Sequence, residues 1–205
     1  MKKTILSIFL SFLAITALGQ NYGFSIDDEN EPYLSGTISY DCQPTTAWNR
    51  LVTCVNNTYS SIDHKLMICN LSQKAIIIDN DTHTISVHGF GENSKIRFNP
   101  FAGTFGDYIL YSLTLTMKED GEITYLYNNL ALRYKATGLV NENQTKSVRL
   151  ILKELKQANE KAADTNLSKK ERNSILNSVK DMESTLSKAV ETLMKRLEAI
   201  IKDVE

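Results

Sequence analysis

The chain has 205 residues, of which 42% are hydrophobic and 23% are charged, and its formal net charge at pH 7 is −1. This length suits one ordinary domain, alone or with an appendage. Residues 20–145 carry 14 acidic and 8 basic side chains, whereas residues 146–205 carry 10 acidic and 13 basic. Because neither part is strongly basic, nucleic acid is excluded as an expected partner.

The first nineteen residues have the pattern of a secretory signal peptide. Lys2 and Lys3 form a short positive segment, residues 5–18 are almost wholly apolar, and Ala17 and Gly19 are the small residues that a signal peptidase reads. A helix that spans a membrane needs about 20 apolar residues, which is more than this segment offers. We therefore expect cleavage after residue 19, export to the periplasm or beyond, and no stable membrane insertion of the mature protein.

The region after the leader predicts a lead-in, a strand and a helix. Residues 20–35 are acidic and irregular, and we expect a flexible lead-in there. Residues 37–40 alternate polar with apolar side chains, which is typical of a half-buried strand. Residues 44–46 end this strand and start a helix with apolar positions at helical spacing. Trp48, the only tryptophan, lies in its first turn and is expected to be a packing anchor.

Four strand-like segments follow this helix. The first is continuous and apolar, and the other three alternate apolar with polar side chains. Glycines at 89 and 91 are expected to end the second strand, and residues 92–107 form the longest irregular segment. Asp120 and Gly121 favour a tight hairpin between the third and fourth strands. Residues 130–135 can add a short edge strand or a loop. The four predicted strands are residues 75–79, 82–88, 109–117 and 123–127.

From Thr145 onward the apolar period becomes helical. Ser168 and Glu171 have the spacing of a capping box, which separates a shorter helix from a longer one. The longer helix has a heptad seam and would run about 50 Å, against about 30 Å for its predecessor. Part of its seam is therefore expected to need another partner, such as a second copy of the chain. The candidate helix interface consists of Leu186, Leu193, Leu197, Ile200 and Val204.

The order strand, helix, four strands, helix matches a half-repeat of the TATA-binding-protein-like fold. Three segments carry the likeness: TTAWNRLVTCV, AIIIDNDTHTISVHGFG and YILYSLTLTMKEDGEITYLYNNL. Over residues 36–133 the chain resembles an exported bacteroidetal family of unknown function to which this fold is assigned. The resemblance implies a fold and an exported location. The family brings no established activity and no catalytic residues.

We therefore predict an α+β fold in which an antiparallel sheet packs on helix, followed by a C-terminal helical hairpin with one long helix. The expected division is a signal peptide at 1–19, a flexible lead-in at 20–35, the TATA-binding-protein-like domain at 36–144 and a coiled-coil-like extension at 145–205. DNA binding would need basic side chains and apolar wedges on the exposed sheet face. That face is instead expected to present the candidate binding residues Ser112, Thr114, Thr116 and Thr124.

No residue pattern predicts a cofactor, a metal site or a catalytic centre. His83 and His88 are five positions apart, so on one strand they would point to opposite faces and could not share a metal. No nucleophile elbow or Cys–His arrangement is present. Cys42, Cys54 and Cys69 can be buried small side chains, or two of them can form a disulfide, and all three pairings remain open.

The leading functional hypothesis is an exported, non-catalytic module of the bacterial envelope. It would bind a protein, peptide or glycan partner through its sheet face, or associate with itself through its long helix. One alternative is an envelope hydrolase with an atypical site in the 89–107 loop, built on His88 and Asp107. The other alternative is a structural spacer of the envelope.

Overall fold

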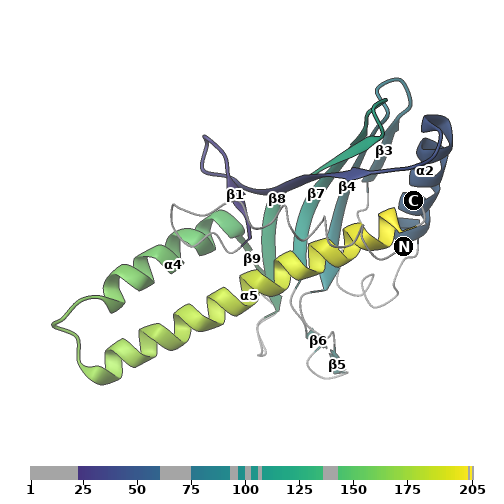
Figure 1. Cartoon of the computed structure of the whole chain (residues 1–205). Coiled ribbons are helices and arrows are strands. Elements are labelled where there is room, and N and C mark those ends of the chain that lie inside the picture. Colours follow the sequence, from purple (N-terminus) through teal and green to yellow (C-terminus); the bar gives the residue numbers. More distant parts are fainter. Residues whose placement is uncertain are drawn as a thin grey trace.

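The computed structural model describes residues 23–60, 75–92, 97–99, 103–105, 108–135, 143–202 and 204. The predicted signal peptide, His64, Cys69 and Asp107 lie outside these residues. Among the helices of the described part, none has the length and apolar character that crossing a membrane requires. Figure 1 shows a curved sheet with one long helix lying across it.

The sheet has seven strands, and every pair of neighbours is antiparallel. With the two strands of a separate hairpin, the described part of the chain contains, in chain order, β1 (Ser25–Ile26), β2 (Pro32–Ser39), β3 (Ala75–Asp79), β4 (Thr84–Glu92), β5 (Arg97–Asn99), β6 (Gly103–Phe105), β7 (Tyr108–Met117), β8 (Glu122–Lys135) and β9 (Asn143–Ser147). Their order across the sheet is β1-β2-β8-β7-β4-β3, while β9 pairs with the last third of β8. β5 and β6 form a separate hairpin.

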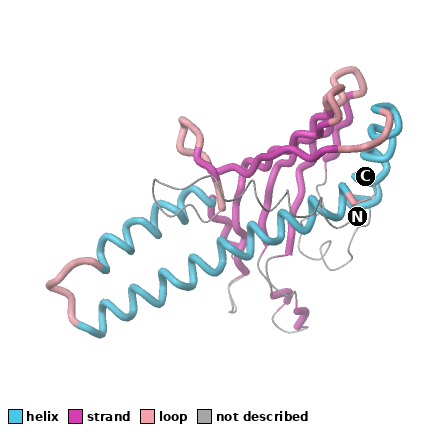
Figure 2. Tube along the Cα trace, in the orientation of Figure 1, coloured by secondary structure: helices cyan, strands magenta, loops and turns pink. Residues whose placement is uncertain are grey.

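Three helices accompany the described sheet: α2 (Pro44–Ser60), α4 (Val148–Ala162) and α5 (Lys169–Ile201). α2 begins with a proline, whose missing N–H is not needed in a first turn. The predicted capping box of α5 is confirmed, since Ser168 and Glu171 each bond the backbone N–H of the other. α4 and α5 run antiparallel, and Figure 2 shows their connecting loop at the end away from the sheet.

The hydrophobic core lies between one face of the sheet and the helices. Alternate residues of β7 and β8 point into it, which confirms the apolar face predicted for both strands. α2 and the second half of α5 cover this face, and α4 packs beside the first half of α5 and against β8. The fully buried side chains of the two central strands are Ile109, Leu113, Leu115, Ile123, Tyr127 and Leu132.

A cluster of tyrosines joins the sheet to both helices. The hydroxyls of Tyr59 on α2 and Tyr111 on β7 lie 2.8 Å apart, and Tyr127 donates to the carbonyl of Leu193 on α5 at 3.1 Å. Burial raises the pKa of all three phenols above the ordinary value. Their hydroxyls are thus buried but hydrogen-bonded, as interior polar groups must be.

Two glycines of β4 explain why this strand does not end where the sequence predicted. β4 continues through Gly89 and Gly91 to Glu92. A Cβ atom on Gly89 would lie 2.9 Å from the ring of Tyr111, and one on Gly91 would overlap Thr192 of α5. The glycines therefore let a ring and a helix approach the sheet closely, and they are not chain breakers here.

The predicted flexible lead-in differs from the structure in its described part, residues 23–35. β1 pairs with β2, and Phe24 is only 2% exposed within the core. The Asp27 carboxylate accepts bonds from the backbone N–H groups of Glu29 and Glu31, which orders the turn between the strands. Arg149 of α4 then contacts Glu31 at 2.5 Å. The acidic residues that suggested a flexible lead-in thus belong to the turn of the β1–β2 hairpin.

The C-terminal helical hairpin is present, but it is not an extension separate from the sheet. Residues 143–147, which include the predicted start of the helical region, form strand β9, and α5 packs across β4 and β7. The predicted boundary at residue 145 therefore falls inside a strand. Figure 1 shows that α4 and the first half of α5 project beyond the sheet, whereas the second half of α5 lies across it.

Candidate functional site

The four predicted sheet-face residues lie on the face of the sheet opposite the helices. Ser112, Thr114 and Thr116 alternate with buried residues along β7, and all three are half-buried. Thr124 stands beside Thr116 on β8 and is also half-buried. The antiparallel register extends this pattern to the neighbouring strands β4 and β2.

Three rows of polar side chains result, and we call them together the open face. Each row crosses neighbouring strands at register positions, so its members stand side by side. Hydroxyl groups predominate in the first two rows. Row one is Thr84, Thr116, Thr124 and Thr37, row two is Ser86, Thr114, Leu126 and Ser35, and row three is His88, Ser112 and Asn128.

The hydroxyls of row one bond to one another and to the sheet. The Thr84 and Thr116 Oγ1 atoms are 3.4 Å apart, and Thr124 Oγ1 donates to the Thr116 carbonyl at 3.3 Å. Thr37, at the end of the row on β2, is exposed. This row is a continuous polar surface across four strands.

Row three contains the most elaborate hydrogen bonding of the open face. His88 Nδ1 and Ser112 Oγ are 2.9 Å apart, and the Asn129 amide nitrogen donates to the same Oγ at 3.1 Å. With Asn129 donating to it, the Ser112 hydroxyl can give its own proton to Nδ1. The other nitrogen of a neutral His88, Nε2, then carries the ring proton. His88 and Asn129 are both exposed.

A β-bulge places Asn129 in this cluster. The register jumps between Leu110 and Ser112 of β7, so Asn129 and Leu130 of β8 together face Tyr111. Asn129 has φ +51°, a left-handed conformation that asparagine tolerates better than most residues. Without the extra residue, position 129 would point into the core. The bulge therefore turns a polar side chain toward Ser112.

The open face ends just beyond row three. Phe90 and Tyr108 lie two or more residues further along β4 and β7, and both are buried. Their rings meet edge to face with centroids 6.5 Å apart. Row three is thus bounded by an apolar pair on one side and by the hydroxyl rows on the other.

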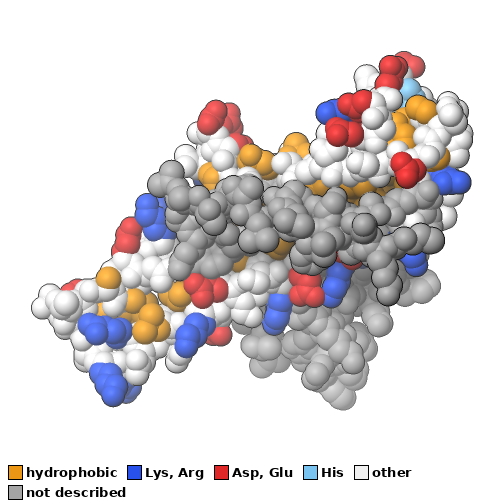
Figure 3. Space-filling model, in the orientation of Figure 1, with side chains coloured by type: hydrophobic (Ala, Val, Ile, Leu, Met, Phe, Trp, Pro, Cys, Tyr) orange, Lys and Arg blue, Asp and Glu red, His pale blue; other side chains and the backbone are white. Residues whose placement is uncertain are grey.

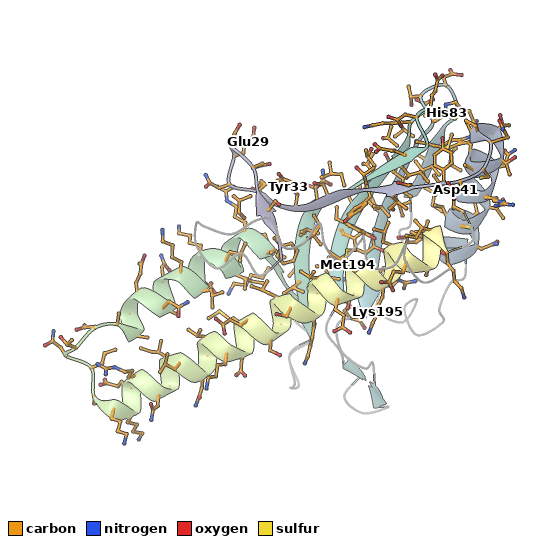
Figure 4. The ribbon with its side chains drawn as sticks, viewed as in Figure 1. Glu29, Tyr33, Asp41, His83, Met194 and Lys195 are labelled. Atoms are coloured by element: carbon orange, nitrogen blue, oxygen red, sulfur yellow. The ribbon has the colours of Figure 1, made fainter. Side chains whose placement is uncertain are left out.

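Across β4, β7, β8 and β2 the rows carry no Asp, Glu, Lys or Arg, but Asp79 of β3 stands opposite Thr84 at the end of row one. Other acidic side chains gather beyond row one, where the β3–β4 and β7–β8 turns lie (Figure 3). Figure 4 shows His83 and Asp41 at this end. The acidic residues of these turns and of the β2–α2 connection are Asp41, Asp79, Asp81, Glu119 and Asp120.

The spacing argument for the two described histidines does not apply in the structure, because only His88 is on a strand. His83 lies in the β3–β4 turn with φ +48°, and its ring meets that of Trp48 edge-on at 5.0 Å. The Trp48 Nε1 donates to Asn80 at 3.0 Å, and Trp48 is only 6% exposed, which fits a packing anchor. Within the described ranges no three His, Cys, Asp or Glu side chains are placed to hold a metal ion.

The candidate helix interface is wrong as a surface for another chain. All five side chains are at most 2% exposed, because the protein's own sheet and α2 already cover the seam. The second half of α5 therefore has its partner within the same chain. The buried residues concerned are Leu186, Leu193, Leu197, Ile200 and Val204.

The cysteines and the proposed hydrolase pair are only partly within the described chain. Cys42 donates to the carbonyl of Val204 at 3.8 Å, and it is not joined to Cys54. Asp107, the predicted partner of His88 in a hydrolase, lies outside the described residues. Opposite His88 on β3 stands Ala75, so the hairpin does not bring Asp79 to it.

No family model and no curated protein matches the chain. Among solved structures it is similar to a TBP-like protein from Parabacteroides distasonis ATCC 8503, with 10% identity, 88% of this chain and 96% of that chain covered, and a TM-score of 0.55. A DUF4468 family protein from Bacteroides ovatus ATCC 8483 has 13% identity, coverages of 87% and 90%, and a TM-score of 0.44. The first likeness confirms, at the level of fold, the predicted resemblance to bacteroidetal proteins with a TATA-binding-protein-like fold.

Proposed function

We propose that this protein is an exported, non-catalytic binding module of the bacterial envelope that uses the open face of its sheet. The observation that carries the proposal is the register of the three rows, which aligns half-exposed hydroxyl, amide and imidazole groups across neighbouring strands. Such groups both donate and accept hydrogen bonds, so a polar ligand can find partners on every strand. Export rests on the leader pattern of residues 1–19.

The chemistry of row three supports binding over hydrolysis. A serine nucleophile needs a histidine that a third group orients, and donors aimed at the developing oxyanion. Here His88 contacts Ser112, but Asn129 bonds the serine and not the histidine. Among the described residues no hydrogen bond or ion pair joins a carboxylate to His88. No contact among the described residues therefore favours the hydrolase alternative.

The proposal is tested by placing a charge on the middle of the open face. Thr114→Arg puts a long cation on row two, where the outward side chain can leave the core intact, and we expect it to abolish binding to isolated envelope material from the producing bacterium. Thr165→Arg makes the same substitution in the exposed α4–α5 loop and should bind like the unaltered protein.

Binding is measured as protein retained on immobilised envelope material, and circular dichroism checks that both variants are folded. Equal retention of both variants would place the binding surface elsewhere on the molecule. No retention of the unaltered protein would favour the structural spacer instead.

A further inference from the structure

We infer that the ligand of the open face is a neutral glycan chain lying along row three, over His88 of β4, Ser112 of β7 and Asn129 of β8, with Tyr33 of β2 at the end of the row. The inference rests on the proposed function and adds the ligand's chemistry and position. It is drawn from four features of the described residues: charge, hydrogen-bonding groups, shape and an aromatic side chain.

Charge selects a neutral ligand. Across β4, β7, β8 and β2 the three rows carry no cationic side chain that could pair with a phosphate, sulfate or carboxylate, and no carboxylate that could pair with an ammonium group. The carboxylate of Asp79 on β3 lies at the end of row one, whereas the β3 neighbour of row three is Ala75. Desolvating a charged ligand on such a surface would not be offset by an ion pair. A ligand rich in hydroxyl groups avoids this cost.

Row three supplies the directional hydrogen bonds. The Asn129 amide and the His88 ring are exposed, and both are held by bonds to Ser112. Each keeps a polar atom beyond that contact: the Asn129 carbonyl oxygen and His88 Nε2. Two neighbouring groups that differ as acceptor and donor suit adjacent hydroxyls on one sugar ring.

The bulge adds Asn129 to the polar groups that can recognise a ligand on row three. Asn129 reaches the open face only because it is the extra residue of β8, in the left-handed conformation. β-Bulges are devices that re-aim a side chain, and residues held in uncommon backbone conformations cluster at functional sites. Asn128, the regular member of row three, stands beside it.

Tyr33 extends the row on β2. Leu34 pairs with Tyr127, so Tyr33 stands next in line toward Asn128, and it is half-buried. Figure 4 shows Tyr33 on β2 close to the turn that carries Glu29. From β4 to β2 the row crosses three strand spacings, or about 14 Å. A tyrosine offers an apolar ring with a polar tip, which suits the faces and hydroxyls of sugars.

A glycan fits this surface better than a peptide does. Peptides that bind to sheets commonly add a strand to an edge, where backbone groups provide the affinity and side-chain pockets the specificity. The open face is instead the broad side of the central strands, where Leu126 is the single aliphatic side chain of the rows, and the exposed Ile77 lies on β3 beside row two. A short extended polymer of hydroxylated rings can lie across several strands at once.

The test is calorimetric titration of the protein with neutral tetrasaccharides of glucose, mannose, galactose and N-acetylglucosamine, each up to millimolar concentration. Tetragalacturonate serves as the charged counterpart. We expect at least one neutral tetrasaccharide to bind and tetragalacturonate not to bind.

Two matched glycine variants locate the site. Asn129→Gly keeps the left-handed backbone and removes only the amide, so it should fold and weaken binding about tenfold, the size of one good polar contact. Asn30→Gly makes the same change at φ +63° in the β1–β2 turn and should bind normally. Tyr33→Ala should weaken binding as well.

The outcomes separate the two proposals. If no neutral tetrasaccharide binds, while Thr114→Arg still abolishes retention on envelope material, the glycan inference is overturned and the face binds something else, such as a protein. If Asn129→Gly binds the tetrasaccharide as well as Asn30→Gly does, the position along row three is wrong. Failure of both the titration and the retention assay removes the proposed function as well.

Discussion

Asn129 changes which residues of β8 are buried. Before it, the odd positions Tyr125 and Tyr127 face the core, and after it the even positions Leu130 and Leu132 do so. A period of two cannot continue through one extra residue. Alternation alone therefore does not decide whether residues 130–135 form a strand or a loop, although a shift from odd to even apolar positions indicates a bulge.

The residues of the candidate site that lie on regular strands could be predicted from the sequence, but the contacts between them could not. Strict alternation along β7 placed Ser112, Thr114 and Thr116 on one face, and the hairpin placed Thr124 beside them. The contact between His88 and Ser112 depends on the register between strands that are 24 residues apart, which no local pattern specifies. Asn129 joined the cluster only through the bulge.

At this scale the buried tyrosines predict a fall in stability at alkaline pH. Because burial raises the pKa of Tyr59, Tyr111 and Tyr127 in the folded protein, the unfolded chain loses these protons first. Their contribution is fully present below the unfolded pKa of about 10 and declines as the pH rises above it. Urea unfolding between about pH 9 and about pH 11 should show this decline.

Tyr127→Phe should make that decline shallower, because one ionisable phenol is gone from the core. Tyr33→Phe changes a half-buried tyrosine outside the cluster and serves as the control. An identical pH dependence for Tyr127→Phe and the unaltered protein would show that the buried phenols do not set the alkaline limit.

At the scale of elements, α5 shows what a heptad seam can and cannot reveal. The spacing of its apolar residues correctly predicted a long helix with one buried stripe. The stripe does not say whether a helix or a sheet covers it, because both need apolar residues every three or four positions. In this protein the cover changes along α5, from α4 in its first half to the sheet and α2 in its second.

Leu193→Ala should therefore destabilise the fold itself. Leu193 is fully buried under the sheet, and removing such a side chain typically costs about 2–5 kcal/mol. Leu176→Ala, in the projecting half of α5, removes a side chain that is 38% exposed and should cost less than about 1 kcal/mol. Urea unfolding measures both. A Leu193→Ala variant that keeps its stability but loses self-association would restore the helix-interface hypothesis.

At the scale of the whole molecule, the order of elements was enough to predict the fold. The strand, the helix and the four principal strands were found from periodicity, and the likeness to the TBP-like protein from Parabacteroides distasonis supports the assignment at only 10% identity. β1, β9 and the β5–β6 hairpin were missed. β1 is two residues long and β9 is polar, so neither has the apolar alternation that identifies a strand.

The leader gives a prediction at this scale. When the full chain is produced in a bacterium, we expect cleavage between Gly19 and Gln20, and mass spectrometry of the exported protein should find Gln20 as its first residue. Ala17→Leu combined with Gly19→Leu removes the small residues and should leave the leader attached. An uncleaved, cell-associated form of the unaltered protein would contradict the expected export.

The way α5 covers the sheet also sets the order in which the chain can fold. Every strand of the sheet precedes α5 in the chain, yet Tyr127 and its neighbours are buried only when Leu193 and the rest of the seam arrive. During synthesis the part of the apolar face that α5 covers would thus stay uncovered until the long helix is complete, and folding that depends on such distant contacts is slow. This order of folding would suit the export that we propose, because a chain that has not yet folded can pass through a translocation channel.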